Sequence, residues 1–214
     1  MWITEFKAFN ERKDKIILSS FLIVLSLYLS FTTTYFVASV DTVRESVVRL
    51  HILANSDSEK DQAVKLQVRD ALLETNSKLL SGNVNTDNVE EYFELSKDEL
   101  LKVAKETLKE NGINYGAKIT LTNEYFETRE YGDYTFPAGE YTSLKVVLGE
   151  GKGHNWWCVM FPPMCVSVAG EIETDDKKIT DCLTESGEKA VSNGTKYVVK
   201  FKLLEIFEEL KNKV

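Results

Sequence analysis

The feature that most limits what this chain can form is an uncharged stretch from Ile16 to Val40, which contains no Asp, Glu, Lys or Arg. A helix needs about 20 consecutive apolar residues to cross the hydrocarbon core of a bilayer, and this stretch is long enough. It also lacks the polar stripe that a surface helix of a soluble protein carries. We therefore predict a membrane-crossing helix, either a cleaved signal sequence or a retained signal anchor.

The residues before this stretch predict its direction. Four basic residues precede it, three of them directly before it: Lys7, Arg12, Lys13 and Lys15. Because basic flanks stay in the cytoplasm, the rest of the chain is predicted to be exported. Val37–Ser39 offers small residues for cleavage, although it is not an Ala-x-Ala site. We divide the chain into residues 1–40, a signal sequence or anchor, and residues 41–214, an exported domain.

The exported part is acidic. The whole chain carries a net charge of −8, whereas residues 1–40 hold four basic and three acidic residues. A domain with this excess of negative charge has no electrostatic reason to bind nucleic acid. It is also not attracted to an anionic membrane surface.

Apolar periodicity in the exported part predicts one α+β domain. Strands are predicted at 47–54, 117–128, 142–148, 156–161 and 196–201, and helices at 57–80, 86–95, 96–111 and 203–213. Capping boxes are predicted at Ser56 with Glu59 and at Ser96 with Glu99. We expect three or four helices packed on a mostly antiparallel sheet. Because the strands alternate apolar and polar residues, only one face of the sheet should be buried.

Residues 149–165, GEGKGHNWWCVMFPPMC, are the most unusual stretch of the domain. Successive strand side chains point to opposite faces, so one of Trp156 and Trp157 should lie in the core. The other must be covered by a loop or by another protein. Pro162 and Pro163 cannot donate ladder hydrogen bonds and should end the strand. An aromatic pair beside a rigid loop suits a protein-binding hot spot, although a purely structural role stays open.

Three cysteines occur, at positions 158, 165 and 182. In an exported domain a pair of cysteines can stay oxidised, and Cys158 with Cys165 is the pair closest in sequence. Cys182 would then be left over. Connectivity cannot be fixed from sequence, so this disulfide is a hypothesis.

Candidate catalytic and metal-binding groups are few. We interpret His51 as a core or edge histidine of the first strand. His154 and Cys158 could form a nucleophilic pair, but a disulfide would remove the thiol. A zinc site from these two residues with the other cysteines lacks the short Cys-x2–4-Cys spacing. The glycines at 149–153 lack the Lys-Ser/Thr ending of a phosphate-binding loop. We expect no catalytic activity, no metal and no cofactor.

Two segments together resemble the stage II sporulation protein R family. The first signature begins with His51–Gln62, HILANSDSEKDQ, and continues to Asp70. The second consists of residues 136–141, FPAGEY, and residues 149–165. The similarity extends over about 47–168, and the second signature is long and chemically unusual.

The resemblance implies a secreted signal of endospore formation without a known catalytic activity of its own. Members of this family are exported from the forespore into the space between the forespore and mother-cell membranes. There they stimulate a membrane aspartic protease of the mother cell that converts pro-sigma-E into its active form.

Two groups of residues are candidates for contact with that protease. One is the aromatic loop, with Asn155, Trp156, Trp157, Phe161, Pro162 and Pro163. The other is the first signature, with His51, Asn55, Asp57, Asp61 and Arg69. Two other classes of protein stay open: an exported cell-wall hydrolase that uses His154 or a carboxylate pair, and a structural envelope protein held by an uncleaved anchor.

Overall fold

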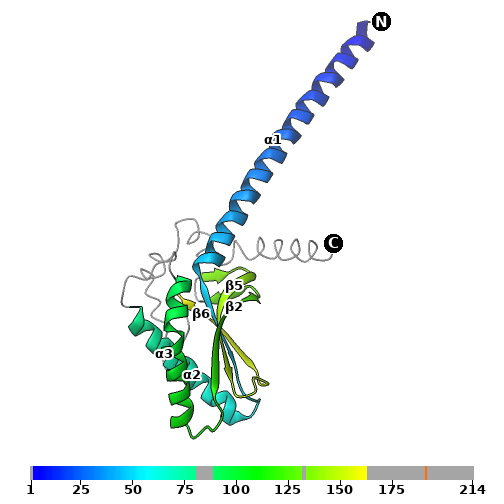
Figure 1. The fold of residues 1–214 in the computed structure, drawn as a ribbon. Coiled ribbons are helices and arrows are strands. Elements are labelled where there is room, and N and C mark those ends of the chain that lie inside the picture. Colours follow the sequence, from blue (N-terminus) through cyan, green and yellow to red (C-terminus); the bar gives the residue numbers. More distant parts are fainter. Residues whose placement is uncertain (1, 81–88, 132–133, 163–190, 192–214) are drawn as a thin grey trace. The chain divides into compact units, whose positions relative to one another are not determined.

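The computed structural model describes residues 2–80, 89–131, 134–162 and Val191 (Figure 1). The chain separates into two units, Met1–Ser39 and Val40–Val214. The strand predicted at 196–201 and the helix predicted at 203–213 lie outside the described residues.

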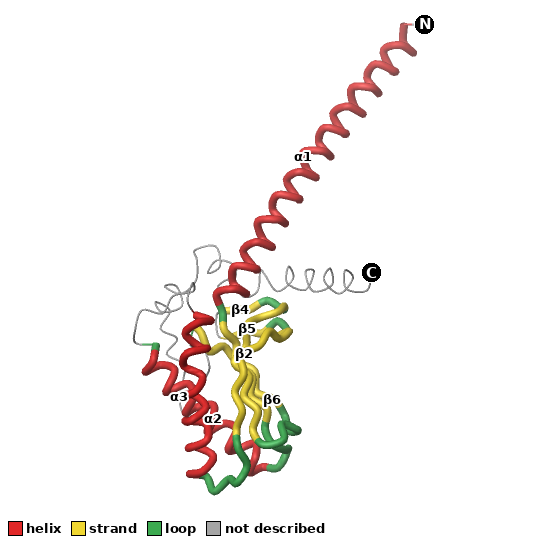
Figure 2. Tube along the Cα trace, in the orientation of Figure 1, coloured by secondary structure: helices red, strands yellow, loops and turns green. Residues whose placement is uncertain are grey.

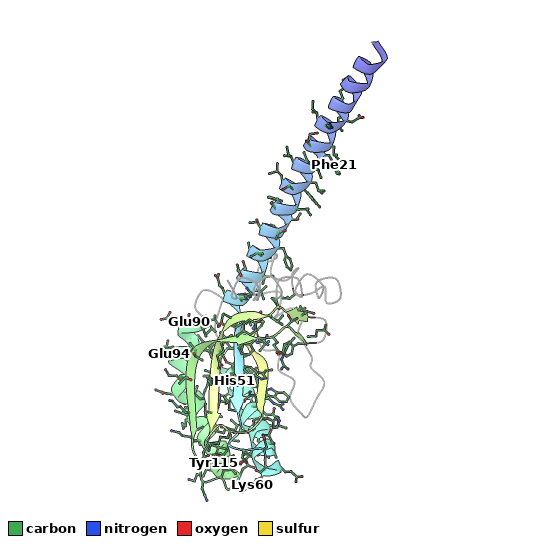
Figure 3. The ribbon with its side chains drawn as sticks, turned by 90° about the vertical axis from the view of Figure 1, so that its right-hand side faces the viewer. Phe21, His51, Lys60, Glu90, Glu94 and Tyr115 are labelled. Atoms are coloured by element: carbon green, nitrogen blue, oxygen red, sulfur yellow. The ribbon has the colours of Figure 1, made fainter. Side chains whose placement is uncertain are left out.

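The first unit is formed by helix α1 (Trp2–Ser46), whose last residues belong to the second unit. Between Lys13 and Ser46 the helix reaches a mean hydropathy of 2.0 and is long enough to cross a membrane. Its large apolar side chains project outward, as Figure 3 shows for Phe21. Phe21 is 61% exposed. A signal sequence near the N-terminus meets the same test of length and composition, so the helix agrees with both predicted alternatives.

The second unit contains a four-stranded sheet in the order β2-β5-β1-β6 and a separate two-stranded sheet. The strands are β1 (Val48–Leu53), β2 (Ala117–Phe126), β3 (Arg129–Tyr131), β4 (Tyr134–Phe136), β5 (Gly139–Leu148) and β6 (Asn155–Phe161). Strand β1 pairs in parallel with β5 and antiparallel with β6, and β2 pairs antiparallel with β5. The predicted α+β class is confirmed, with a mixed sheet in which most pairings are antiparallel.

Helices α2 (Glu59–Leu79) and α3 (Val89–Glu110) pack on one face of the four-stranded sheet, as Figure 2 shows. The apolar residues of neighbouring strands align there, with Leu50 opposite both Leu144 and Cys158. The helices contribute the other half of this core, with Val64, Val68, Leu72, Phe93, Leu100, Ala104 and Leu108.

The opposite face of β1 is also buried, so the expectation of a single buried face is wrong. Arg49 is 0% exposed and His51 is 4% exposed, although both occupy the polar positions of the strand. A second apolar cluster lies near them, formed by Val43, Val47, Phe126, Tyr134, Phe136, Tyr141, Val159 and Val191. Aromatic rings can cover a guanidinium or an imidazole. Polar residues at alternate positions of β1 therefore do not mark an exposed face.

Both predicted capping boxes are also wrong. Helix α2 begins after Ser58, whose hydroxyl accepts the N–H of Asp61 at 3.2 Å. The Ser56 hydroxyl instead donates to the Asp61 carboxylate at 2.5 Å and accepts the Ser58 N–H at 3.2 Å, so its partners are not those of a capping box with Glu59. Helix α3 runs through Ser96 without a break, because Phe93, Leu100 and the later core residues form one continuous buried stripe.

Candidate functional site

The two signature segments meet where the turn that follows β5 packs on the start of α2. The Gly153 N–H donates to the Ala54 carbonyl at 2.9 Å, and the Lys152 N–H donates to the Asn55 carbonyl at 3.2 Å. These N–H groups are directed at the first signature and are therefore not available to a phosphate. The phosphate-loop interpretation is excluded by this use of the backbone, in agreement with the sequence.

Asn55 and Asp61 hold this junction together. The Asn55 side chain accepts the Glu150 N–H at 2.9 Å and donates to Asp61 at 2.9 Å. Asp61 also accepts from Ser56 at 2.5 Å and from the Tyr115 hydroxyl at 2.7 Å. These donors, Ser56 first and Tyr115 next, lower the pKa of Asp61 to about 2. Asp61 is therefore a charged acceptor that fixes the start of α2 to its surroundings.

Two glycines of the second signature are required by close approach. Gly149 has φ 56°, and a Cβ there would collide with the side chain of Asn55. A Cβ at Gly153 would collide with the Ser56 carbonyl. The glycines thus allow the second signature to pack closely against Asn55 and Ser56 of the first.

His154 pairs with Asp57 rather than with a thiol. The backbone N–H of His154 donates to the Asp57 carboxylate at 2.6 Å, and the ring Nδ1 of His154 contacts the same oxygen. The side-chain and backbone hydrogen bonds from His154 lower the pKa of Asp57. Cys158 is disulfide-bonded and so has no thiol to act as a nucleophile. Cys165 and Cys182 lie outside the described residues, so the pairing of Cys158 with Cys165 stays a prediction.

Trp156 and Trp157 lie on opposite faces of β6, as the strand geometry predicted. The Arg69 guanidinium carbon is 4.3 Å from the ring centroid of Trp156 on the helix face. On the other face Trp157 stacks on His51, with ring centroids 3.7 Å apart and planes 14° apart. Both tryptophans are only partly buried, so the surface reaches both indoles.

Residues 44–171, more than half of the chain, match the family model for stage II sporulation protein R. Both signature segments lie within this range. The chain belongs to the stage II sporulation protein R family. One curated relative is Stage II sporulation protein R of Bacillus subtilis (strain 168), 36% identical over 123 residues, which are 58% of this chain and 55% of the relative. The chain thus spans about half the length of the curated relative that it matches. No solved structure matches it.

The signatures of this family are mainly structural in the present chain. Of the predicted contact residues, His51, Asp61, Arg69 and Phe161 are buried. Asn55, Trp156 and Trp157 are partly exposed, and Asp57 and Asn155 are exposed. Pro162 ends β6, and Pro163 lies outside the described residues. The buried contact residues therefore support the exposed ones from beneath.

His51 is a buried histidine of the first strand, as the sequence indicated, and only its Nδ1 has a hydrogen-bond partner among the described residues. Its Nδ1 lies 3.0 Å and 3.2 Å from the two carboxylate oxygens of Glu124, which also accepts from Lys145 at 2.6 Å. Burial alone would raise the pKa of Glu124, but the hydrogen bonds from Lys145 and His51 outweigh it and lower the pKa. Figure 3 places His51 midway along the sheet.

Sequence reasoning missed Arg49, which lies just before the first signature. Its guanidinium carbon is 4.5–5.8 Å from the ring centroids of Phe126, Tyr131, Phe136 and Tyr141. Burial lowers the pKa of Arg49. Two of these rings come from residues 136–141 of the second signature, so that segment encloses Arg49. The signal in the sequence was the even spacing of these four aromatic residues, five positions apart.

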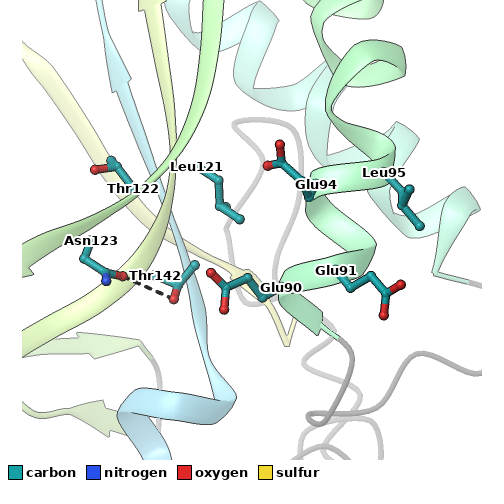
Figure 4. Close-up of a pocket in the computed structure, with 8 residues that line it drawn as sticks. All are labelled: Glu90, Glu91, Glu94, Leu95, Leu121, Thr122, Asn123 and Thr142. Carbon is teal, nitrogen blue, oxygen red and sulfur yellow. Dashed lines mark hydrogen bonds between the residues drawn. The ribbon is translucent and has the colours of Figure 1, made fainter.

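A separate groove of about 480 Å³ lies between the start of α3 and strands β2 and β5. In Figure 4, Glu90 and Glu94 face Leu121 and Thr142 across it. Its other lining residues are Glu91, Leu95, Thr122 and Asn123. No residue of the two signature segments lines this groove. Within the described part of the chain, no group of three or more His, Cys, Asp or Glu is placed to hold a metal.

Proposed function

We propose that this chain is an exported signal of endospore formation that activates a membrane aspartic protease of the mother cell and so promotes processing of pro-sigma-E. Membership of the stage II sporulation protein R family supports this proposal. The apolar helix α1 supports export, because it is suited to a signal sequence or an anchor. The proposed location is the space between the forespore and mother-cell membranes.

The observation that carries the proposal is the partial exposure of Trp156 and Trp157 within the family signature. Tryptophans are enriched among the residues that dominate binding energy in protein interfaces. Here each indole rests on a buried side chain, Arg69 or His51, that holds it in position. A fixed aromatic surface loses little conformational entropy when a partner binds.

The mechanism that fits this surface is binding without chemistry. A protein that binds the active arrangement of the protease more tightly than the inactive arrangement shifts the population toward the active one. Such a signal needs no catalytic group of its own. Its strength is set by the difference between its affinities for the two arrangements.

Co-expression in a non-sporulating bacterium tests this function. The chain, the protease and pro-sigma-E are produced together, and the processed product is measured by immunoblot. Processing should require the chain. A variant with Leu22→Arg and Leu25→Arg should abolish it at an equal protein level, because two charges inside the apolar stretch oppose membrane insertion. Equal processing without the chain, or with this variant, contradicts the proposal.

A further inference from the structure

The last turns of α1 form part of the core of the exported domain. Val40, Val43 and Val47 are each 0% exposed, and all three lie in the second unit of the chain. Two of them, Val43 and Val47, belong to the apolar cluster that also contains Phe126, Tyr134, Phe136, Tyr141, Val159 and Val191. The core of the domain therefore begins within α1, at the residue where the uncharged stretch ends.

A segment of the second signature fixes these turns of the helix. The Arg44 side chain donates to the carbonyl of Ala138, which lies in the FPAGEY segment, residues 136–141. A Cβ at Gly139 would collide with the Arg44 guanidinium, so glycine leaves room for this contact. Phe136 and Tyr141 of the same segment lie in the apolar cluster with Val43. The end of α1 is thus held by residues that define the family signature.

No linker separates the apolar stretch from this core. The uncharged residues run from Ile16 to Val40, and Val40 is already fully buried. A secretory signal is usually cut at small residues that follow an apolar segment of about 7–15 residues. Here the small residues, Val37–Ser39, lie inside α1, which continues unbroken to Ser46. The apolar stretch also exceeds that length and reaches the length of a membrane-crossing helix.

Cleavage after Ser39 would put a charged amino group beside the core. The new N-terminus would be the ammonium group of Val40, whose side chain is fully buried, and a charge is costly in apolar surroundings. In a helix the N–H groups of residues 40–43 bond to carbonyls four residues earlier, and the cut would remove these acceptors. A positive charge at a helix N-terminus also opposes the helix dipole. The remaining helix, residues 40–46, would be too short to persist by its own hydrogen bonds.

We propose that α1 is a retained signal anchor, and that the chain acts while it is still attached to the lipid bilayer through which it was exported. The reason is that cleavage beside residue 40 would damage the core on which the second signature packs. The inference goes beyond the proposed function and rests only on its export step. An anchored chain stays confined to one membrane surface, which raises its effective concentration for a partner in the facing membrane.

The form of the chain in cells tests the inference directly. The full chain with a C-terminal tag is produced in an endospore-forming bacterium, and its membranes are washed with alkaline carbonate, which removes proteins that are not inserted. We expect the chain to stay in the washed membranes with an intact mass that includes α1. The variant with Leu22→Arg and Leu25→Arg is the control for the wash, because it should not insert and should leave the membranes. A wild-type chain that begins at Val40, or that appears in the soluble fraction, overturns the inference.

A pair of valine substitutions tests whether the end of α1 belongs to the core. Val43→Ala truncates a residue that is 0% exposed, and we expect the folding equilibrium constant of the full chain in detergent to fall about tenfold. Val24→Ala is the matched control, because Val24 lies in the same helix and is 64% exposed, so it should leave this constant unchanged. Unfolding is followed by tryptophan fluorescence. Equal unfolding of the two variants would overturn the inference, because α1 would then end outside the core.

The outcomes separate this inference from the proposed function. If the chain begins at Val40 and still promotes processing of pro-sigma-E, the retained anchor is overturned while the proposed function stands. If the chain keeps α1 in the washed membranes but does not promote processing, the proposed function fails and the anchor stands. The mass and the fractionation therefore decide the inference without the processing assay.

Discussion

The imidazole of His51 and the indole of Trp157 stack at 3.7 Å and join the first family signature on β1 to the second on β6. The two residues are direct neighbours across the antiparallel pair. Phe126 of β2 meets the same indole edge-to-face at 4.9 Å. An exposed part of the signature is therefore held by contacts that reach across the sheet.

Replacing Trp157 with alanine should destabilise the domain. The change removes the stack on His51 and the contact with Phe126, and we expect a loss of about 2–3 kcal/mol in the free energy of unfolding. Denaturant unfolding of the full chain in detergent measures this loss. Leu95→Ala is the control, because Leu95 is 78% exposed and its truncation should change stability by less than about 0.5 kcal/mol. Equal stability of the two variants would contradict the stacking argument.

Asp61 should make stability depend on acid pH. Its pKa is about 2 in the folded chain, against an ordinary value of 3.8. Because the folded pKa is depressed, the stabilisation is complete above the unfolded value and is lost as pH falls from about 4 toward 2. Asp61→Asn should remove this part of the pH dependence and destabilise the domain at neutral pH. Glu106→Gln, at an exposed carboxylate of α3, is the control and should leave the acid profile nearly unchanged.

Gly149 should be far less tolerant of alanine than Gly112. Both have a positive φ, 56° and 64°, so both substitutions impose backbone strain of about 1–2 kcal/mol. A Cβ at Gly112 meets nothing within 4 Å, whereas one at Gly149 collides with Asn55. Gly149→Ala should therefore lose more stability than Gly112→Ala in the same unfolding measurement. Equal losses would show that the junction yields to the extra methyl group.

Local patterns in the sequence predicted most of the elements but not their ends. The apolar stripe of α2 is regular, yet Ser56 and Ser58 both stand three residues before an acidic residue. Contacts in the folded chain decide which serine caps the helix: the Ser58 hydroxyl accepts the Asp61 N–H, whereas the Ser56 hydroxyl accepts the Ser58 N–H and donates to the Asp61 carboxylate. Ser96 has a cap-like spacing to Glu99, but the core of α3 continues through it, because burial of a stripe outweighs a local cap.

Contacts between distant segments could not be read from the sequence. Arg49 and His51 have the spacing of exposed strand positions, and their burial depends on aromatic rings from β2, β3, β4, β5 and β6. The parallel pairing of β1 with β5 joins segments separated by two helices and by strands β2, β3 and β4. The resemblance identified both signatures, but their joint role at the start of α2 follows only from hydrogen bonds such as that of Gly153 with Ala54.

The disulfide of Cys158 offers a prediction about connectivity. Cys158 is 2% exposed and disulfide-bonded, and Cys165 is its expected partner because the two are close in sequence. Cys165→Ser should therefore leave Cys158 free to react with an alkylating agent in denaturant, whereas Cys182→Ser should not. Non-reducing peptide mapping by mass spectrometry identifies the cysteine that is bonded to Cys158. Loss of a native disulfide costs about 2–5 kcal/mol, so only the variant that breaks the bond should unfold at lower denaturant. Alkylation of Cys158 in the Cys182→Ser variant instead would assign the bond to Cys182.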